Sequence, residues 1–264
     1  MRTLRIAFLS VLFAHPLACG GGETLDNENA TTVAALALAE TAGADDEGSL
    51  GALAFSEVPA ASAPGKADAA TTEERLARFK DYVTSKISCA NTVEAAGAVT
   101  LTFGKDCTWA GKRWSGEATF TYDTPNSVTV DFAGLSVRGA TTTGTFTVTR
   151  KGERHVTLEG SRSSEAAGVT VDATVVLEAQ WDEDSLALVS AKRTKTVDGA
   201  SRTYTALGVH WVRGERAPET GTMSWLTRAG KTYTIAFART SEGALEATVT
   251  SPTGTTTVPV DDLG

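Results

Sequence analysis

The feature of the sequence that most constrains the fold is a regular alternation between Val169 and Trp181. Every second residue from Val169 onward is apolar, and the residues between them are polar except for Val176. A two-residue period places successive side chains on opposite faces of a strand, so we expect one buried face and one face in water. At roughly 3.3 Å per residue such a strand spans about 40 Å, far more than the usual five or six residues. The sequence therefore predicts a large sheet.

Shorter alternations of the same kind occur on both sides of this stretch. They are separated by turn signals, of which Asp198-Gly199 and Ala229-Gly230 are the clearest. No helical period lies between them, so local antiparallel connections are favoured over parallel crossovers. The sequence predicts a mainly β domain, an antiparallel meander of about eleven or twelve strands. Because an open sheet of this size exposes its edges, we expect a curved sheet or a partly closed barrel.

One amphipathic helix is predicted at the start of this domain. Thr71 and Glu74 have the spacing of a capping box. The apolar stripe that follows at helical spacing consists of Leu76, Phe79, Val83 and Ile87. We expect this helix to cover one edge or opening of the sheet, although a helix that binds a partner has the same pattern.

The first 18 residues have the layout of a secretory signal peptide. Arg2 and Arg5 precede an apolar run from residue 6 to residue 13, and small residues follow it. The apolar run is too short to span a bilayer. We therefore expect the chain to be exported.

The residues that follow the apolar run, Pro16-Leu17-Ala18-Cys19-Gly20-Gly21-Gly22, resemble the lipobox of bacterial lipoproteins. The resemblance implies that Cys19 becomes the lipidated first residue of the mature chain. Pro16 departs from the pattern, because lipoboxes usually have Leu three residues before the cysteine. The alternative is an ordinary signal peptidase that cuts near Ala18.

The glycines after Cys19 and the long acidic segment beyond them also resemble lipoproteins of Gram-negative soil bacteria, the myxobacteria in particular. The resemblance implies that Gly20, in place of Asp, favours transport to the outer membrane. The expected location is therefore the outer membrane, with the protein facing either the periplasm or the cell surface. Acyl chains on Cys19 anchor a protein by burying methylene groups in the bilayer.

Residues 19–70 are predicted to be a disordered tether rich in Ala and Gly. This segment contains nine acidic residues and one basic residue, Lys66. It offers too little apolar area to offset the entropy of ordering. Residues 71–264 contain 23 acidic and 21 basic residues, so the predicted β domain is almost neutral. This balance argues against a nucleic-acid partner.

Two cysteines remain once Cys19 is assigned to lipid. Cys89 and Cys107 are expected to pair as a disulfide in an oxidising compartment and to join the helix to the first strand, predicted at residues 97–103. The alternative is a metal site, which needs further ligands, and neither His155 nor His210 is near in sequence. We expect no metal.

The candidate ligand-binding residues are Trp109 and Trp114. They flank Gly111-Lys112-Arg113 just after Cys107, in what is expected to be a loop. Two such indoles can stack on a sugar or line the rim of a pocket, and the alternative is that at least one of them fills the end of the sheet. The other three tryptophans fall on predicted strands and are expected to lie in the core.

Signals for catalysis are weak. His155 lies at strand spacing from Glu153 and Glu159, which places all three on one face. The sequence lacks the Gly-x-Ser-x-Gly motif of an activated serine and a glycine loop for phosphate. We name no catalytic residue and no cofactor.

Three functions of different class are consistent with these features. The first is an exported lipoprotein whose β domain has a structural or binding role. The second is a carrier of a lipid or another hydrophobic ligand, because an opening helix followed by an unclosed antiparallel barrel is similar to carriers of the lipoprotein-localisation type. The third is a hydrolase whose site is assembled from distant residues. The sequence does not identify the ligand or the protein partner.

Overall fold

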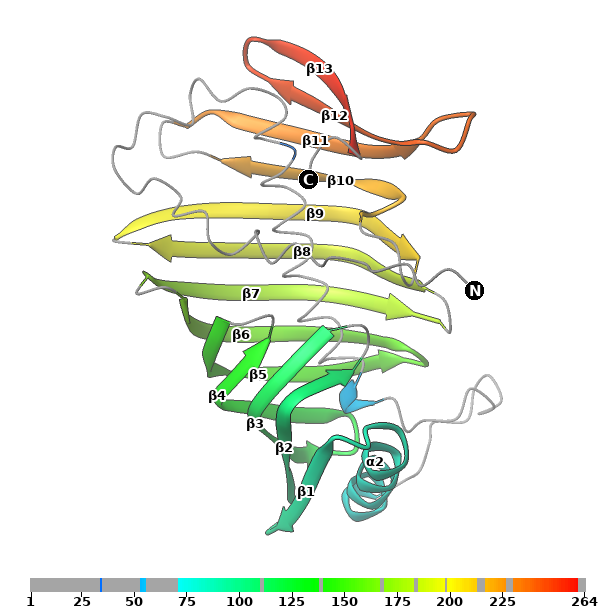
Figure 1. Cartoon of the computed structure of the whole chain (residues 1–264), viewed down its shortest axis with the longest axis vertical. Helices are drawn as coiled ribbons and strands as arrows, with labels where there is room; N and C mark the ends of the chain where they lie inside the picture. Colours follow the sequence, from blue (N-terminus) through cyan, green and yellow to red (C-terminus); the bar gives the residue numbers. More distant parts are fainter. Residues whose placement is uncertain are drawn as a thin grey trace, which may run out of the picture.

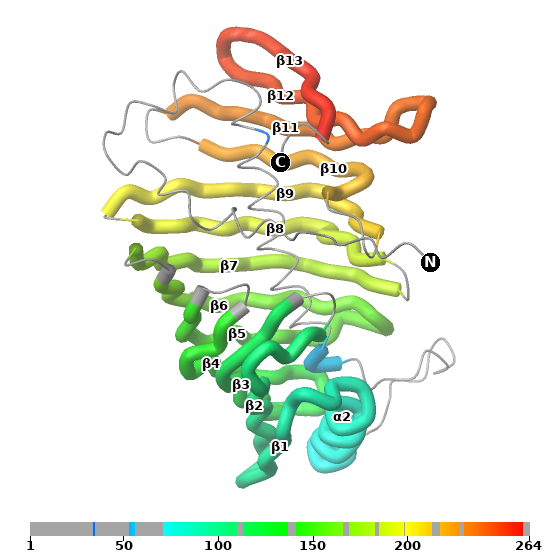
Figure 2. The backbone as a smooth tube through the Cα atoms, in the orientation of Figure 1, coloured from blue at the N-terminus to red at the C-terminus, as the bar shows by residue number. Residues whose placement is uncertain are grey.

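The computed structural model contains one antiparallel sheet and a helix packed at one of its ends (Figure 1). It describes residues 34, 53–55, 71–109, 112–137, 140–166, 169–182, 185–197, 199–212, 217–226 and 230–260. The expected signal peptide and Cys19 lie outside these residues, as does most of the expected tether. The tube in Figure 2 follows the chain back and forth from the helix to the C-terminal hairpin.

The sheet has 13 strands, and each one pairs with its neighbours in the chain. In order they are β1 (Ala90–Ala95), β2 (Ala98–Trp109), β3 (Lys112–Thr124), β4 (Ser127–Val137), β5 (Ala140–Gly152), β6 (His155–Ala166), β7 (Val169–Trp181), β8 (Ser185–Val197), β9 (Ala200–Val212), β10 (Thr220–Leu226), β11 (Thr232–Arg239), β12 (Leu245–Ser251) and β13 (Gly254–Pro259). The predicted antiparallel meander is confirmed. Among the described strands β1 and β13 are the two edges, so the sheet is curved but open.

The first helix of the β domain, α2 (Thr72–Lys86), begins where the sequence predicts. The Thr71 hydroxyl accepts a hydrogen bond from the Glu74 backbone N–H, and the Glu74 carboxylate accepts one from the Thr71 N–H. This capping box satisfies two N–H groups that a helix start leaves without partners. The helix packs on β1, β2 and β3, and its apolar stripe is buried there.

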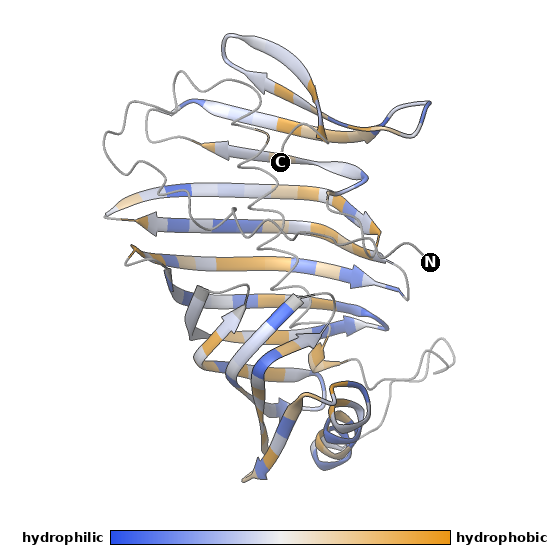
Figure 3. Ribbon diagram, in the orientation of Figure 1, coloured by the Kyte–Doolittle hydropathy of each residue, from blue (hydrophilic) through white to orange (hydrophobic). Residues whose placement is uncertain are grey.

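The alternation that predicted the long strand is visible in the burial of β7. Ala173, Val175, Leu177 and Ala179 are buried, whereas Val176 between them is half exposed. Figure 3 shows that hydrophobic and hydrophilic residues occur together along the same strands of the sheet. The buried apolar residues of these strands form one core, because residues paired across neighbouring strands lie on the same side of the sheet.

Strand β1 was not predicted, and two strands continue beyond a bulge. Strand β4 reaches Val137 through a bulge at Gly134, where φ is 78°. The strand expected at residues 97–103 extends to Trp109 after a shift of register that includes Asp106, at φ 69°. Bulges hide these continuations, since they interrupt the two-residue period.

Gly160 of β6 is required by the packing of the sheet. It lies opposite Phe146 of β5, and a Cβ atom at position 160 would be 2.4 Å from the Phe146 ring carbon Cδ1 and 2.1 Å from the Thr145 oxygen. The glycine therefore gives the Phe146 ring space to lie across the neighbouring strand.

Three residues of the expected tether are part of the core. Leu53, Ala54 and Phe55 are buried, and the Phe55 ring meets the ring of Tyr122 edge to face at 6.5 Å between centroids. At these residues, the chain packs against the β domain and does not extend into solvent. Ala34 is also buried in this core.

Candidate functional site

The two tryptophans proposed as ligand-binding residues lie on a β-hairpin. Trp109 is the last residue of β2, and Trp114 lies near the start of β3, opposite Cys107. The expectation that both lie in a loop was wrong, because the strands continue on both sides of Ala110 and Gly111. The bulge after Phe103 lengthens β2 beyond its recognisable alternation.

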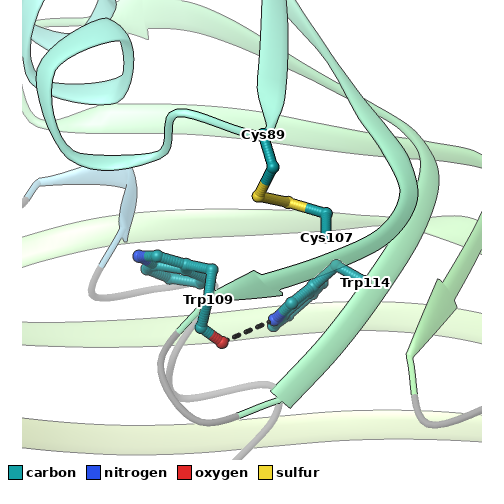
Figure 4. The surroundings of a disulfide bond; sticks show 4 residues. All are labelled: Cys89, Cys107, Trp109 and Trp114. Atoms are coloured by element: carbon teal, nitrogen blue, oxygen red, sulfur yellow. Dashed lines mark hydrogen bonds between the residues drawn. A yellow bond between two sulfur atoms is a disulfide. The ribbon is translucent and has the colours of Figure 1, made fainter.

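The side chains of these two tryptophans have different environments. Trp114 is fully buried, and its ring stacks on Phe103 with 5.5 Å between centroids. Its Nε1 donates a hydrogen bond to the carbonyl oxygen of Trp109, 3.0 Å away (Figure 4). Trp109 is only partly buried. Trp114 is thus a core residue in this structure, and Trp109 is the indole of the pair that reaches the surface.

A disulfide between Cys89 and Cys107 is attached to this hairpin near its turn, and the pairing is as predicted (Figure 4). Cys89 lies just after α2, and Cys107 is buried within β2. The Cys89 carbonyl oxygen also accepts a hydrogen bond from the Gly104 N–H at 3.1 Å. The bond therefore fixes the end of the helix to the bulged part of β2. Disulfides of this kind persist in oxidising compartments.

The outward-facing side of the sheet carries rows of hydroxyl groups that run across the strands. The register places in one row, from β2 to β9, the residues Thr100, Thr119, Asp131, Thr145, Ser161, Thr174, Thr194 and Thr203. We call this side of the sheet the hydroxyl face. The rows were not predicted, because they depend on the register of every strand pair.

Many of these hydroxyls hydrogen-bond to each other across the strands. Thr100 and Thr119 are joined at 2.9 Å, and the Thr145 hydroxyl donates to the Asp131 carboxylate at 2.6 Å. Such cross-strand pairs stabilise a sheet. They also leave oxygen atoms on the surface that can accept hydrogen bonds from a polar partner.

A pocket of about 410 Å³ lies on the sheet and is lined by residues of the four neighbouring strands β5, β6, β7 and β8. Its lining residues are Thr143, Gly144, Ser161, Arg162, Ser163, Asp172, Ala173, Thr174, Thr194 and Thr196. Seven of these residues, all except Gly144, Arg162 and Ala173, lie on the hydroxyl face by their register in the sheet. Six of the lining side chains carry a hydroxyl group, and Asp172 and Arg162 carry opposite charges. This pocket was not predicted, because its residues come from four strands.

Both histidines of the sheet contact carboxylates, but neither lines this pocket. His155 Nε2 is 2.6 Å from Glu178 Oε1, and both side chains are partly exposed. His210 Nδ1 is 3.4 Å from Glu219 Oε2, and Glu219 also accepts a hydrogen bond from Arg239 Nε at 3.0 Å. Glu153 and Glu159 were expected beside His155. The carboxylate that contacts the His155 imidazole at 2.6 Å belongs instead to Glu178 of β7. These pairs fix the orientation of the imidazoles on the sheet surface.

The described residues offer neither a cluster of metal ligands nor a membrane-spanning helix. Within this part of the chain, no group of three or more His, Cys, Asp or Glu side chains is placed to hold a metal ion. None of its helices is long and apolar enough to cross a bilayer.

Comparison with known proteins identified no relative. No protein-family model, curated protein or solved structure matches the chain.

Proposed function

We propose that the chain is the precursor of an exported lipoprotein, anchored through Cys19, whose β domain has a structural or binding role. The observation that carries this proposal is the disulfide between Cys89 and Cys107. It supports an oxidising compartment, in agreement with the signal-peptide pattern. The sequence has three cysteines, so Cys19 is the one that remains for the lipid.

The distribution of polar and apolar residues supports a binding or structural role. One face of the sheet is buried, with α2 packed against it at β1, β2 and β3. The hydroxyl face points outward and includes seven of the ten residues that line the pocket at β5–β8. A partner of the β domain therefore meets hydroxyls and scattered charges, which favour hydrogen bonding over hydrophobic association.

The carrier function has less support. A carrier of an acyl chain needs an apolar cavity, whereas Phe120, Phe146 and Trp225 are buried in the shared core and the pocket at β5–β8 is rich in hydroxyls. A hydrolase also has less support, because His155 and His210 contact carboxylates outside that pocket. Native mass spectrometry of the mature protein checks the carrier function: extra mass that disappears on denaturation would favour it.

The anchor is tested by the intact mass of the native protein and by membrane fractionation. The wild-type chain is expected to carry the mass of acyl groups and to sediment with membranes. Cys19→Ser removes the acceptor sulfur, so the added mass and the membrane association are expected to be lost together. Gly22→Ala is the matched control, because it changes the same segment and keeps the cysteine. A native mass without acyl groups would contradict the anchor.

A further inference from the structure

A contact between distant parts of the chain lies beside α2 and β3. Phe79 of α2 packs against Phe120 and Tyr122 of β3, with ring centroids 4.8 and 5.9 Å apart. We call these three residues the aromatic slot. Phe79 and Phe120 are fully buried, so the slot is part of the core.

The residues that meet this slot come from before the helix. Phe55 stands edge to face against Tyr122, and Leu53 and Ala54 are completely buried. The Tyr122 hydroxyl donates a buried hydrogen bond to the Ala54 carbonyl oxygen at 2.7 Å. This bond satisfies a backbone group that burial would otherwise penalise. Leu53–Phe55, which we call the docking segment, therefore has both apolar and polar complementarity to the slot.

The docking segment differs in composition from the residues around it. The segment from residue 20 to residue 70 is acidic and rich in Ala and Gly. Its single phenylalanine is Phe55. Large aromatic side chains dominate the energetics of small interfaces because they bury the most area.

We propose that the aromatic slot is a peptide-binding site whose occupant is the chain's own docking segment. This proposal goes beyond the proposed function and holds whether or not Cys19 carries lipid. The ligand chemistry is an apolar tripeptide with a large aliphatic first residue and an aromatic third residue. Its middle carbonyl accepts the hydrogen bond from Tyr122. The segment binds in cis, so the chain reaches the β domain at residues 53–55 before α2 begins.

The test is to cut the chain between the two partners and ask whether they stay together. A recognition sequence for a site-specific protease is inserted between Gly65 and Lys66 of the mature protein. After cleavage, gel filtration and native mass spectrometry are expected to show the N-terminal fragment bound to the β domain in a complex of monomer size. Separation of the wild-type fragment would overturn the proposal. A dimer in which two uncut chains exchange their docking segments would also overturn it, because the occupant would then belong to a second copy.

Variants identify the contact that retains the fragment. Phe55→Asp places a charge in the buried slot and is expected to release the fragment, while the circular dichroism of the β domain stays unchanged. Ser56→Asp is the matched control, since it adds the same charge at the next position and is expected to retain the fragment. Equal release by both variants would contradict binding through the slot. Tyr122→Phe removes only the hydroxyl and is expected to weaken retention about tenfold.

Discussion

The indole Nε1 of Trp114 donates a hydrogen bond to the carbonyl oxygen of Trp109, 3.0 Å away. The buried tryptophan thus holds the backbone of its partly exposed neighbour across the hairpin. Two residues that look equivalent in the sequence therefore have different roles in the structure.

Replacing the two tryptophans separately is expected to show this difference. Trp114→Ala leaves a cavity beside Phe103 and is expected to lower the free energy of unfolding by about 3–5 kcal/mol. Trp109→Ala removes a partly buried ring and is expected to cost about 1–2 kcal/mol. Urea unfolding followed by circular dichroism measures both. Equal losses would contradict the assignment of Trp114 to the core.

Loss of the disulfide is expected to destabilise the domain. The bond closes a loop with a sequence separation of 18 residues, for which chain entropy gives about 3 kcal/mol. The double variant Cys89→Ala, Cys107→Ala and the reduced wild-type protein are both expected to unfold at lower urea concentration. Cys19→Ser serves as the control and is expected to leave the midpoint unchanged. A loss below about 1 kcal/mol would mean that the bond does little to restrict the unfolded chain.

A methyl group at Gly160 is expected to be poorly tolerated. The added Cβ would lie 2.1 Å from the Thr145 oxygen, so Gly160→Ala is expected to cost about 2 kcal/mol or more through overpacking. Gly152→Ala is the matched control, because its nearest neighbour is 3.8 Å away. That variant is expected to stay within about 0.5 kcal/mol of wild type. Similar thermal midpoints for both variants would show that β5 and β6 separate easily.

The capping box of α2 is expected to contribute to stability. Thr71→Ala removes the hydroxyl that accepts from the Glu74 N–H and is expected to cost about 1 kcal/mol. Thr71→Ser keeps the hydroxyl and is expected to keep most of the stability. The two variants are compared by thermal unfolding. If the serine variant is as unstable as the alanine variant, the lost methyl group and not the cap explains the effect.

The same helix start predicts a dependence on pH. A hydrogen bond from its own backbone N–H, and then one from the Thr71 hydroxyl, lower the pKa of Glu73. The folded state therefore binds this proton less readily than the unfolded state, so the contribution of Glu73 is present at neutral pH and is lost as pH falls through the lowered pKa. Wild type and Glu73→Gln are expected to differ in stability at pH 7 and to converge in acid. A gap that persists in acid would contradict this.

Much of the fold was predictable because a half-buried sheet has a simple period. The bounds of β7 agree with the alternation from Val169 to Trp181, and the turn at Gly199 was clear as well. Strand β1 was missed because it is an edge strand with little burial, so its Val93 is exposed and no alternation marks it. The continuation of β2 was missed because the irregular backbone at Asp106, where φ is 69°, interrupts the two-residue period by which a strand is recognised.

The candidate sites depend on contacts across strands, which the sequence does not give directly. The pairing of Cys89 with Cys107 was predictable because few cysteines compete. The pocket beside Asp172 was not, because it needs the register of three strand pairs to be known. The burial of Phe55 in the core was missed because the residues around it have the composition of a disordered segment. One aromatic residue changes the mean composition of such a segment very little.

The sequential strand order has a consequence for how such a protein is made and how it can change. Every pairing joins chain neighbours, so a hairpin can form as soon as its second strand has been made, without waiting for later parts of the chain. Removing the hairpin of β12 and β13 breaks a single further strand pairing, the one with β11. Evolution can therefore widen or narrow this sheet by whole hairpins at its C-terminal edge, with the disulfide and α2 left intact at the other.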